Sequence, residues 1–138
     1  MENLIATVLT LAAAVLSFLF GLIYLTRPKF MNYHSMAIQK NWEELVPEMQ
    51  VLITALMRAL SSGFLSIALA LSILQIQFNR LHEHWIALTI LIIGSILALG
   101  SLYAMYLIRT KTKGRPPITI VLVIFIMMLL GYFFNIYS

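Results

Sequence analysis

Four long apolar windows limit this chain to one kind of architecture. They cover roughly residues 4–26, 48–76, 85–108 and 118–136, and each is near or above the ~20 residues that a membrane-spanning helix needs. Strands of outer-membrane barrels are only ~10 residues long and alternate in polarity. Hydrophobic residues make up 62% of the chain and charged residues 10%, a balance typical of an integral membrane protein. The sequence therefore predicts a single all-α domain over residues 1–138, an integral membrane four-helix antiparallel bundle.

The basic residues are placed unevenly along this predicted bundle. Arg80 is the one basic residue in the second connection. The positive-inside rule then places residues 27–46 and 109–117 in the cytoplasm and both termini outside. We therefore expect a multi-pass protein of the cell (inner) membrane, and we do not take the net charge of +4 as a sign of nucleic-acid binding. The basic residues of the first and third connections are Arg27, Lys29, Lys40, Arg109, Lys111, Lys113 and Arg115.

The first apolar window does not have the features of a cleaved signal peptide. The segment Met1-Glu2-Asn3 lacks the basic residues that precede a signal sequence. The apolar run that follows is also longer than the usual 7–15 residues. We therefore expect the first span to be retained.

Arg58 is the one basic residue inside an apolar window. It lies roughly 15 Å along the helix from Pro47. A cation in the hydrocarbon costs about 2.5–3.5 kcal/mol on insertion scales, so such a residue usually faces protein or water. At ~100° per residue, Gln50 and Thr54 share its face of the helix. Two interpretations stay open: Arg58 makes a structural ion pair or snorkelling contact, or it contacts a ligand.

The segment from Lys29 to Val46 mixes aromatic, apolar and charged residues. It predicts a short loop followed by an interfacial helix or by the wetted start of the second spanning helix. Asn41 with Glu44 three residues later resembles a capping box. Pro47 then lies in the first turn of a new helix or at a kink.

These features suggest a cavity that opens to the cytoplasm, roofed by residues 30–42 and floored by Arg58. A guanidinium in a low-dielectric site can bind the carboxylate or phosphate of an amphipathic ligand. Tyrosines in the third span belong to an aromatic belt or point a hydroxyl into this cavity. His34 is either a proton carrier or a structural residue. The candidate ligand-binding residues are Arg58, Tyr33, His34, Trp42, Glu44, Gln50, Thr54, Tyr103 and Tyr106.

The sequence offers little to an enzyme mechanism. There is no cysteine and no aspartate, no G-x-S-x-G motif and no phosphate-binding glycine loop. The segment His82-Glu83-His84 lacks the i, i+4 spacing of a helical zinc pair, and it has no third ligand nearby. We therefore expect no metal and no cofactor, and we identify no catalytic residue.

One sequence pattern covers the first connection and half of the second span. It resembles a set of small bacterial four-helix inner-membrane proteins of uncharacterised biochemistry. The resemblance implies the fold and brings no activity. One departure is Asn32, where that pattern has proline. The matching residues are Phe30, Met31, Tyr33, His34, Trp42, Leu45, Gln50, Leu52 and Arg58.

The segment Asn41-x-x-Glu44-x-x-Pro47 also resembles MAPEG proteins, which are four-helix membrane enzymes, often trimeric, that act on glutathione and lipophilic substrates. The arginine that the family places one turn before the asparagine is Ala37 here, so we do not carry a glutathione site over.

Two hypotheses follow from this pattern. We favour a non-enzymatic protein that binds a small amphipathic or anionic ligand, a lipid or a protein partner near Arg58. The alternative is a MAPEG-like enzyme in which Arg58 or Lys40 meets a thiol-bearing cosubstrate between subunits. The expected partners are membrane lipid together with further copies of the chain or the other subunits of a larger membrane complex.

Overall fold

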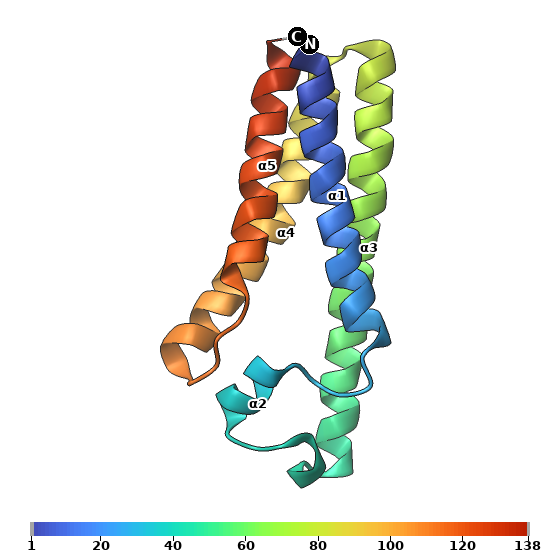
Figure 1. The fold of residues 1–138 in the computed structure, drawn as a ribbon. Coiled ribbons are helices and arrows are strands. Elements are labelled where there is room, and N and C mark those ends of the chain that lie inside the picture. Colours follow the sequence, from blue (N-terminus) through green and yellow to red (C-terminus); the bar gives the residue numbers. More distant parts are fainter. Residues whose placement is uncertain (1, 138) are drawn as a thin grey trace.

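The computed structural model describes residues 2–137, with side chains from residue 4 to residue 137. Within that part every regular element is helical, and the predicted all-α class is confirmed. Four long helices run up and down side by side, and a short fifth lies across one end (Figure 1). The elements are α1 (Glu2–Thr26), α2 (Asn32–Ile38), the 3-10 helix η1 (Trp42–Glu44), α3 (Pro47–Leu81), α4 (His84–Lys111) and α5 (Ile118–Ile136).

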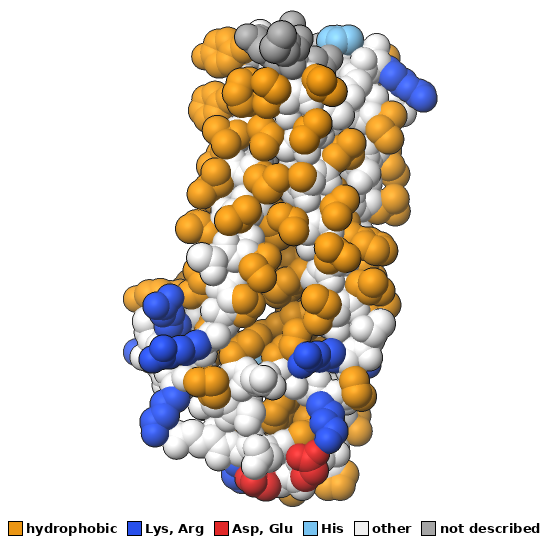
Figure 2. Space-filling view, in the orientation of Figure 1, with side chains coloured by type: hydrophobic (Ala, Val, Ile, Leu, Met, Phe, Trp, Pro, Cys, Tyr) orange, Lys and Arg blue, Asp and Glu red, His pale blue; other side chains and the backbone are white. Residues whose placement is uncertain are grey.

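The long helices form an antiparallel bundle in which α1 packs between α3 and α5, and α4 packs against the same two helices. Both ends of the chain lie at one end of the bundle (Figure 1). We call the opposite end, which carries α2 and the α4–α5 connection, the basic end. Figure 2 shows Lys, Arg and Glu side chains gathered there, below a largely hydrophobic surface.

Each of the four long helices is long and apolar enough to cross a membrane. The predicted windows lie inside them, and α3 and α4 extend beyond their windows at both ends. With 35 residues, α3 is about 52 Å long, well beyond the hydrocarbon thickness of about 30 Å. Because α1 has only 25 residues, the first turns of α3 continue past the end of α1.

Prolines set two of the helix boundaries at the basic end. α1 ends at Thr26, just before Arg27-Pro28, as expected from the loss of an N–H donor and the bias of the preceding residue toward extended backbone. Pro47 lies in the first turn of α3, so the first-turn position that we expected as one alternative is the observed one. These two boundaries leave 20 residues, 27–46, to form α2, η1 and their links.

α1 and α3 approach closely at Gly21. A Cβ atom added there would lie 3.0 Å from Leu65 Cγ and 3.2 Å from the Leu65 backbone nitrogen. The hydroxyl of Ser61 donates a hydrogen bond of 2.8 Å to the Gly21 carbonyl. Small residues commonly allow such close contacts between helices in membranes, where apolar burial alone does not drive association.

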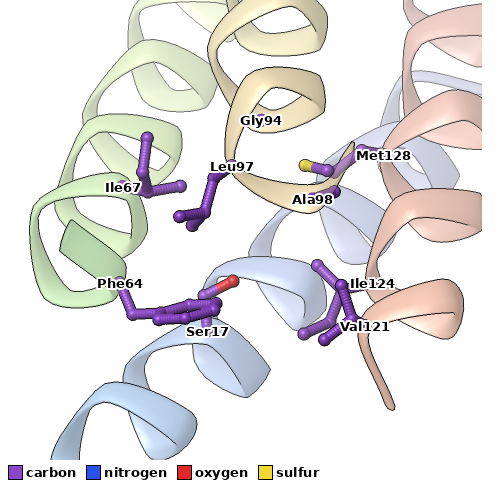
Figure 3. Close-up of a pocket in the computed structure, with 9 residues that line it drawn as sticks. All are labelled: Ser17, Phe64, Ile67, Gly94, Leu97, Ala98, Val121, Ile124 and Met128. Carbon is purple, nitrogen blue, oxygen red and sulfur yellow. The ribbon is translucent and has the colours of Figure 1, made fainter. Parts of the chain in front are cut away.

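The middle of the bundle is filled by side chains. Figure 3 shows residues of α1, α3, α4 and α5 that converge on a void of only about 10 Å³. A void of this size is at the lower limit for holding one water molecule. The centre of the bundle therefore has no room for a ligand, and a binding site must lie elsewhere.

A buried polar network joins three helices near the chain termini. The side-chain amides of Gln75 in α3 and Asn135 in α5 bond to each other in both directions, at 3.3 and 3.1 Å, and both are almost fully buried. Gln75 also donates to Asn79, which accepts a further bond from Thr7 of α1. Because polar groups away from water need partners, these bonds fix how α1, α3 and α5 are aligned.

Candidate functional site

Arg58 contacts the backbone of α1. Its Nη1 donates a hydrogen bond of 2.6 Å to the Tyr24 carbonyl, and its Nη2 donates one of 2.9 Å to the Arg27 carbonyl. The last carbonyls of a helix lack intrahelical donors, and a cation there also complements the helix dipole. Arg58 therefore lies level with the last turn of α1, at the basic end, and its guanidinium makes a structural contact.

The aromatic residues of the 30–42 segment hold α2 against the bundle. The hydroxyl of Tyr33 bonds to the hydroxyl of Tyr24 in α1. The Tyr33 and His34 rings lie 4.1 Å apart between centroids, and Phe30 meets the Trp42 ring edge to face at 5.1 Å. Of the two alternatives for this segment, the structure has a separate short helix, α2, and these contacts explain the Phe-Met-x-Tyr-His pattern structurally.

His34 is positioned as a hydrogen-bond acceptor. Its Nδ1 lies 3.2 Å from the Met31 backbone nitrogen, which donates to it at the start of α2. Burial lowers the pKa of His34 below its usual 6.5. The docked helix α2 therefore favours the neutral imidazole. Burial, followed by the hydrogen bond between the Tyr33 and Tyr24 hydroxyls, also raises the pKa of Tyr33, which stays protonated.

An apolar cleft of about 410 Å³ lies beside α2 at the basic end, and we call it the α2 cleft. The lower part of α4 diverges from α3, and α2 lies across the space between them (Figure 1). Figure 2 shows a hollow walled by hydrophobic side chains just above the charged end. The lining from α1, α2, α4 and the residue that follows α4 consists of Tyr24, His34, Ala37, Ile38, Ile108 and Thr112. The lining from α3 consists of Ile53, Leu56, Met57 and Leu60.

Gly114 brings the α4–α5 connection against α2. A Cβ atom added at Gly114 would lie 2.8 Å from the Tyr33 carbonyl oxygen and 3.0 Å from Ala37 Cβ. It would also lie 2.7 Å from a methyl carbon of Ile108. Only glycine fits here without movement of α2. Gly114 therefore determines how closely the α4–α5 connection approaches α2 at the α4 side of the cleft.

The structure brings few of the predicted site residues into the α2 cleft. Of the nine, His34 alone lines it. Trp42, Gln50 and Thr54 line a separate shallow hollow on α3. Arg58 and Tyr33 do not line the cleft, but each forms a hydrogen bond with Tyr24, which does.

Three more predicted residues also lie away from the cleft. Tyr103 and Tyr106 are 64% and 60% exposed on α4, an arrangement that fits the aromatic-belt alternative. The Glu44 carboxylate accepts a bond of 2.9 Å from Asn41 Nδ2, while Gln50 Nε2 donates to the Trp42 carbonyl at 2.8 Å. The bonds of Glu44 and Gln50 hold η1 in place at the start of α3.

Sequence reasoning missed most of the apolar wall of the cleft. Ala37 and Ile38 follow the Tyr-His pair in α2, Ile108 lies in the last turn of α4, and Thr112 directly follows that helix. Their types are ordinary in a membrane chain, so nothing in them marks a site. A glycine between basic residues, Gly114, was the one local signal of a close contact in this region.

The described residues offer no metal centre. Within residues 2–137, no three His, Asp or Glu side chains converge as metal ligands. An ion pair joins Lys29 and Glu43 on the surface, and the bond from Lys29 lowers the pKa of the Glu43 carboxyl. The α2 cleft itself is lined mainly by apolar side chains.

The four apolar helices and their antiparallel packing define an all-α multi-pass membrane protein. Comparisons of the chain with protein-family models, with curated proteins and with solved structures find no match. The function must therefore be argued from the geometry of this chain alone.

Replacing Arg58 should loosen the end of α1. Arg58→Met leaves the Tyr24 and Arg27 carbonyls without their donors, and we expect a loss of about 1–3 kcal/mol in the free energy of unfolding. Arg58→Lys should lose less, because an ammonium still reaches one carbonyl but lacks the planar fork. Thermal unfolding in detergent measures this, with Arg80→Met at the other end as control. An unchanged midpoint in Arg58→Met would contradict the assigned role.

The docking of α2 should weaken as the pH falls. His34 is neutral when α2 is docked, whereas in undocked α2 it binds a proton near pH 6.5. The free energy of docking therefore has its full value above pH 6.5 and decreases as the pH falls below it. Trp42 fluorescence in a Trp85→Phe background reports on the docking. His34→Gln should remove the pH dependence between about 7 and 5, and His84→Gln should not. Equal pH profiles for His34→Gln and the parent would refute this link.

Proposed function

We propose that the chain lies in the cell (inner) membrane with its basic end in the cytoplasm and both termini outside. Seven Lys and Arg residues lie in or next to the two connections at the basic end, and Arg80 alone lies next to the connection at the other end. Arg58, level with the end of α1, adds an eighth cation on the same side. This asymmetry is the kind that sets orientation during insertion.

We also propose that the protein binds the apolar part of an amphipathic ligand in the α2 cleft. The observation that carries this proposal is the cleft itself, whose 410 Å³ falls within the roughly 300–1,000 Å³ typical of ligand pockets. Nearly all of its lining is aliphatic or aromatic. Transfer of apolar groups into such a site is favourable by roughly 25 cal/mol per Å² of buried surface.

The walls of the cleft favour a ligand that approaches along the membrane. Leu56 and Leu60 on α3 are 60% and 39% exposed, and they face outward where lipid chains lie around a spanning helix. On the opposite side, Tyr24 is buried and fixed through its carbonyl by Arg58. The cleft therefore has one rigid wall of protein and one side open to hydrocarbon. Arg58 acts in this arrangement as a positioning residue for Tyr24.

Filling the cleft should reduce ligand binding. In Leu56→Trp the larger ring occupies the cleft, and we expect labelling by a diazirine-bearing fatty acid in nanodiscs to fall by about tenfold, mapped by mass spectrometry to α2 and the cleft wall. Leu52→Trp, one turn away on the exposed face of α3 and outside the cleft, is the matched control. Labelling spread evenly over the apolar surface, or lost equally in both variants, would count against the proposal.

Single cysteines should report the orientation, because the chain has none of its own. A membrane-impermeant maleimide applied to intact cells should label His84→Cys, in the α3–α4 connection, because that side faces out. It should label Lys111→Cys only after the membrane is opened. The reverse pattern would overturn the proposed orientation and leave the cleft proposal to its own test.

A further inference from the structure

A second hollow adjoins the α2 cleft. It measures about 620 Å³, and its lining includes Arg109 from the last turn of α4 and Lys113 and Arg115 from the α4–α5 connection. Thr112 lines both this basic hollow and the α2 cleft. The apolar cleft and the basic hollow therefore share one lining residue and lie next to each other.

The three cations of this hollow are not neutralised by the described side chains. No described carboxylate lies within ion-pair distance of Arg109, Lys113 or Arg115, in contrast to Lys29, which is paired with Glu43. Lys113 Nζ instead donates a hydrogen bond of 3.5 Å to the neutral side-chain oxygen of Gln39, the residue that follows α2. Three exposed cations around one hollow attract an anion more strongly than cations scattered along a loop.

Gly114 holds these cations next to the cleft. Its missing Cβ lets the connection lie against the Tyr33 carbonyl and Ala37 of α2. Any other residue would push the connection away from α2 and separate the basic hollow from the apolar cleft. The close approach of Gly114 to α2 therefore places the apolar cleft and the basic hollow side by side. Neither the membrane topology nor the charge of the connection requires this placement by itself.

We propose that the α2 cleft and the basic hollow together bind an anionic phospholipid, with an acyl chain in the α2 cleft and its phosphate on Arg109, Lys113 and Arg115. This inference rests on the proposed function, since it takes the cleft as the site of the apolar group. Guanidinium groups bind phosphate oxygens in bidentate fashion, and basic residues beside a membrane favour anionic headgroups. The occupant is a bilayer lipid, because the Leu56 and Leu60 side of the cleft opens toward hydrocarbon.

The test uses the full chain in nanodiscs with a trace of diazirine-bearing phosphatidylglycerol or of the matched phosphatidylcholine. Labelling of the cleft by the anionic lipid should exceed that by the zwitterionic lipid by about tenfold. The triple variant R109Q/K113Q/R115Q should lose this excess. The triple variant R27Q/K40Q/K111Q removes the same charge from the same end, outside the hollow, and should keep it.

Each other outcome identifies what fails. Equal labelling by the two lipids overturns the anionic inference and leaves the cleft as a ligand site, whereas no labelling of the cleft by either lipid overturns the proposed function as well. Equal loss in both triple variants shows an effect of overall charge and overturns the site. Competition by inorganic phosphate at low millimolar concentration shows a soluble-anion site and overturns the lipid as occupant.

Discussion

The contact between Arg58 and the end of α1 holds together the region on which the cleft depends. α1 stops before Pro28, so its last carbonyls need donors from elsewhere. α3 is long enough to pass that point, and the guanidinium of Arg58 supplies two donors in one plane. The Tyr24 carbonyl is one of the two acceptors. The contact therefore holds the Tyr24 ring in the cleft wall, where its hydroxyl bonds to the hydroxyl of Tyr33 in α2.

Unequal helix lengths explain why the cavity lies at the basic end. Where all four long helices run together, side chains fill the interior and leave a void of about 10 Å³. Beyond the end of α1 the bundle has lost one helix, and α4 diverges from α3 (Figure 1). The short helix α2 lies in that space and covers it without filling it. The aromatic contacts of residues 30–42 hold α2 on one side, and Gly114 lies against it on the other.

The architecture was predictable from the sequence, whereas the site was predictable only in part. Hydropathy located the long helices and Pro28 the end of α1, whereas Pro47 left two alternatives, of which the structure has the first-turn position. The structural alternative for Arg58 matches its two carbonyl contacts at the end of α1. Reading one helix at ~100° per residue finds the residues that share a face. It cannot say which neighbour that face meets, as Tyr103 and Tyr106 on the outside of α4 illustrate.

By itself, the sequence determined the all-α class, the number of apolar helices, two of their boundaries and the uneven placement of charge. These follow from local properties: the apolar length of a window, the backbone geometry of proline and the position of each cation. Only the tertiary structure decided the partners of Arg58, the pairing of Gln75 with Asn135 and the contact of Gly114 with α2. Each joins residues roughly 30 to 80 positions apart, and which surfaces meet at that separation depends on the lengths and packing of all the helices together.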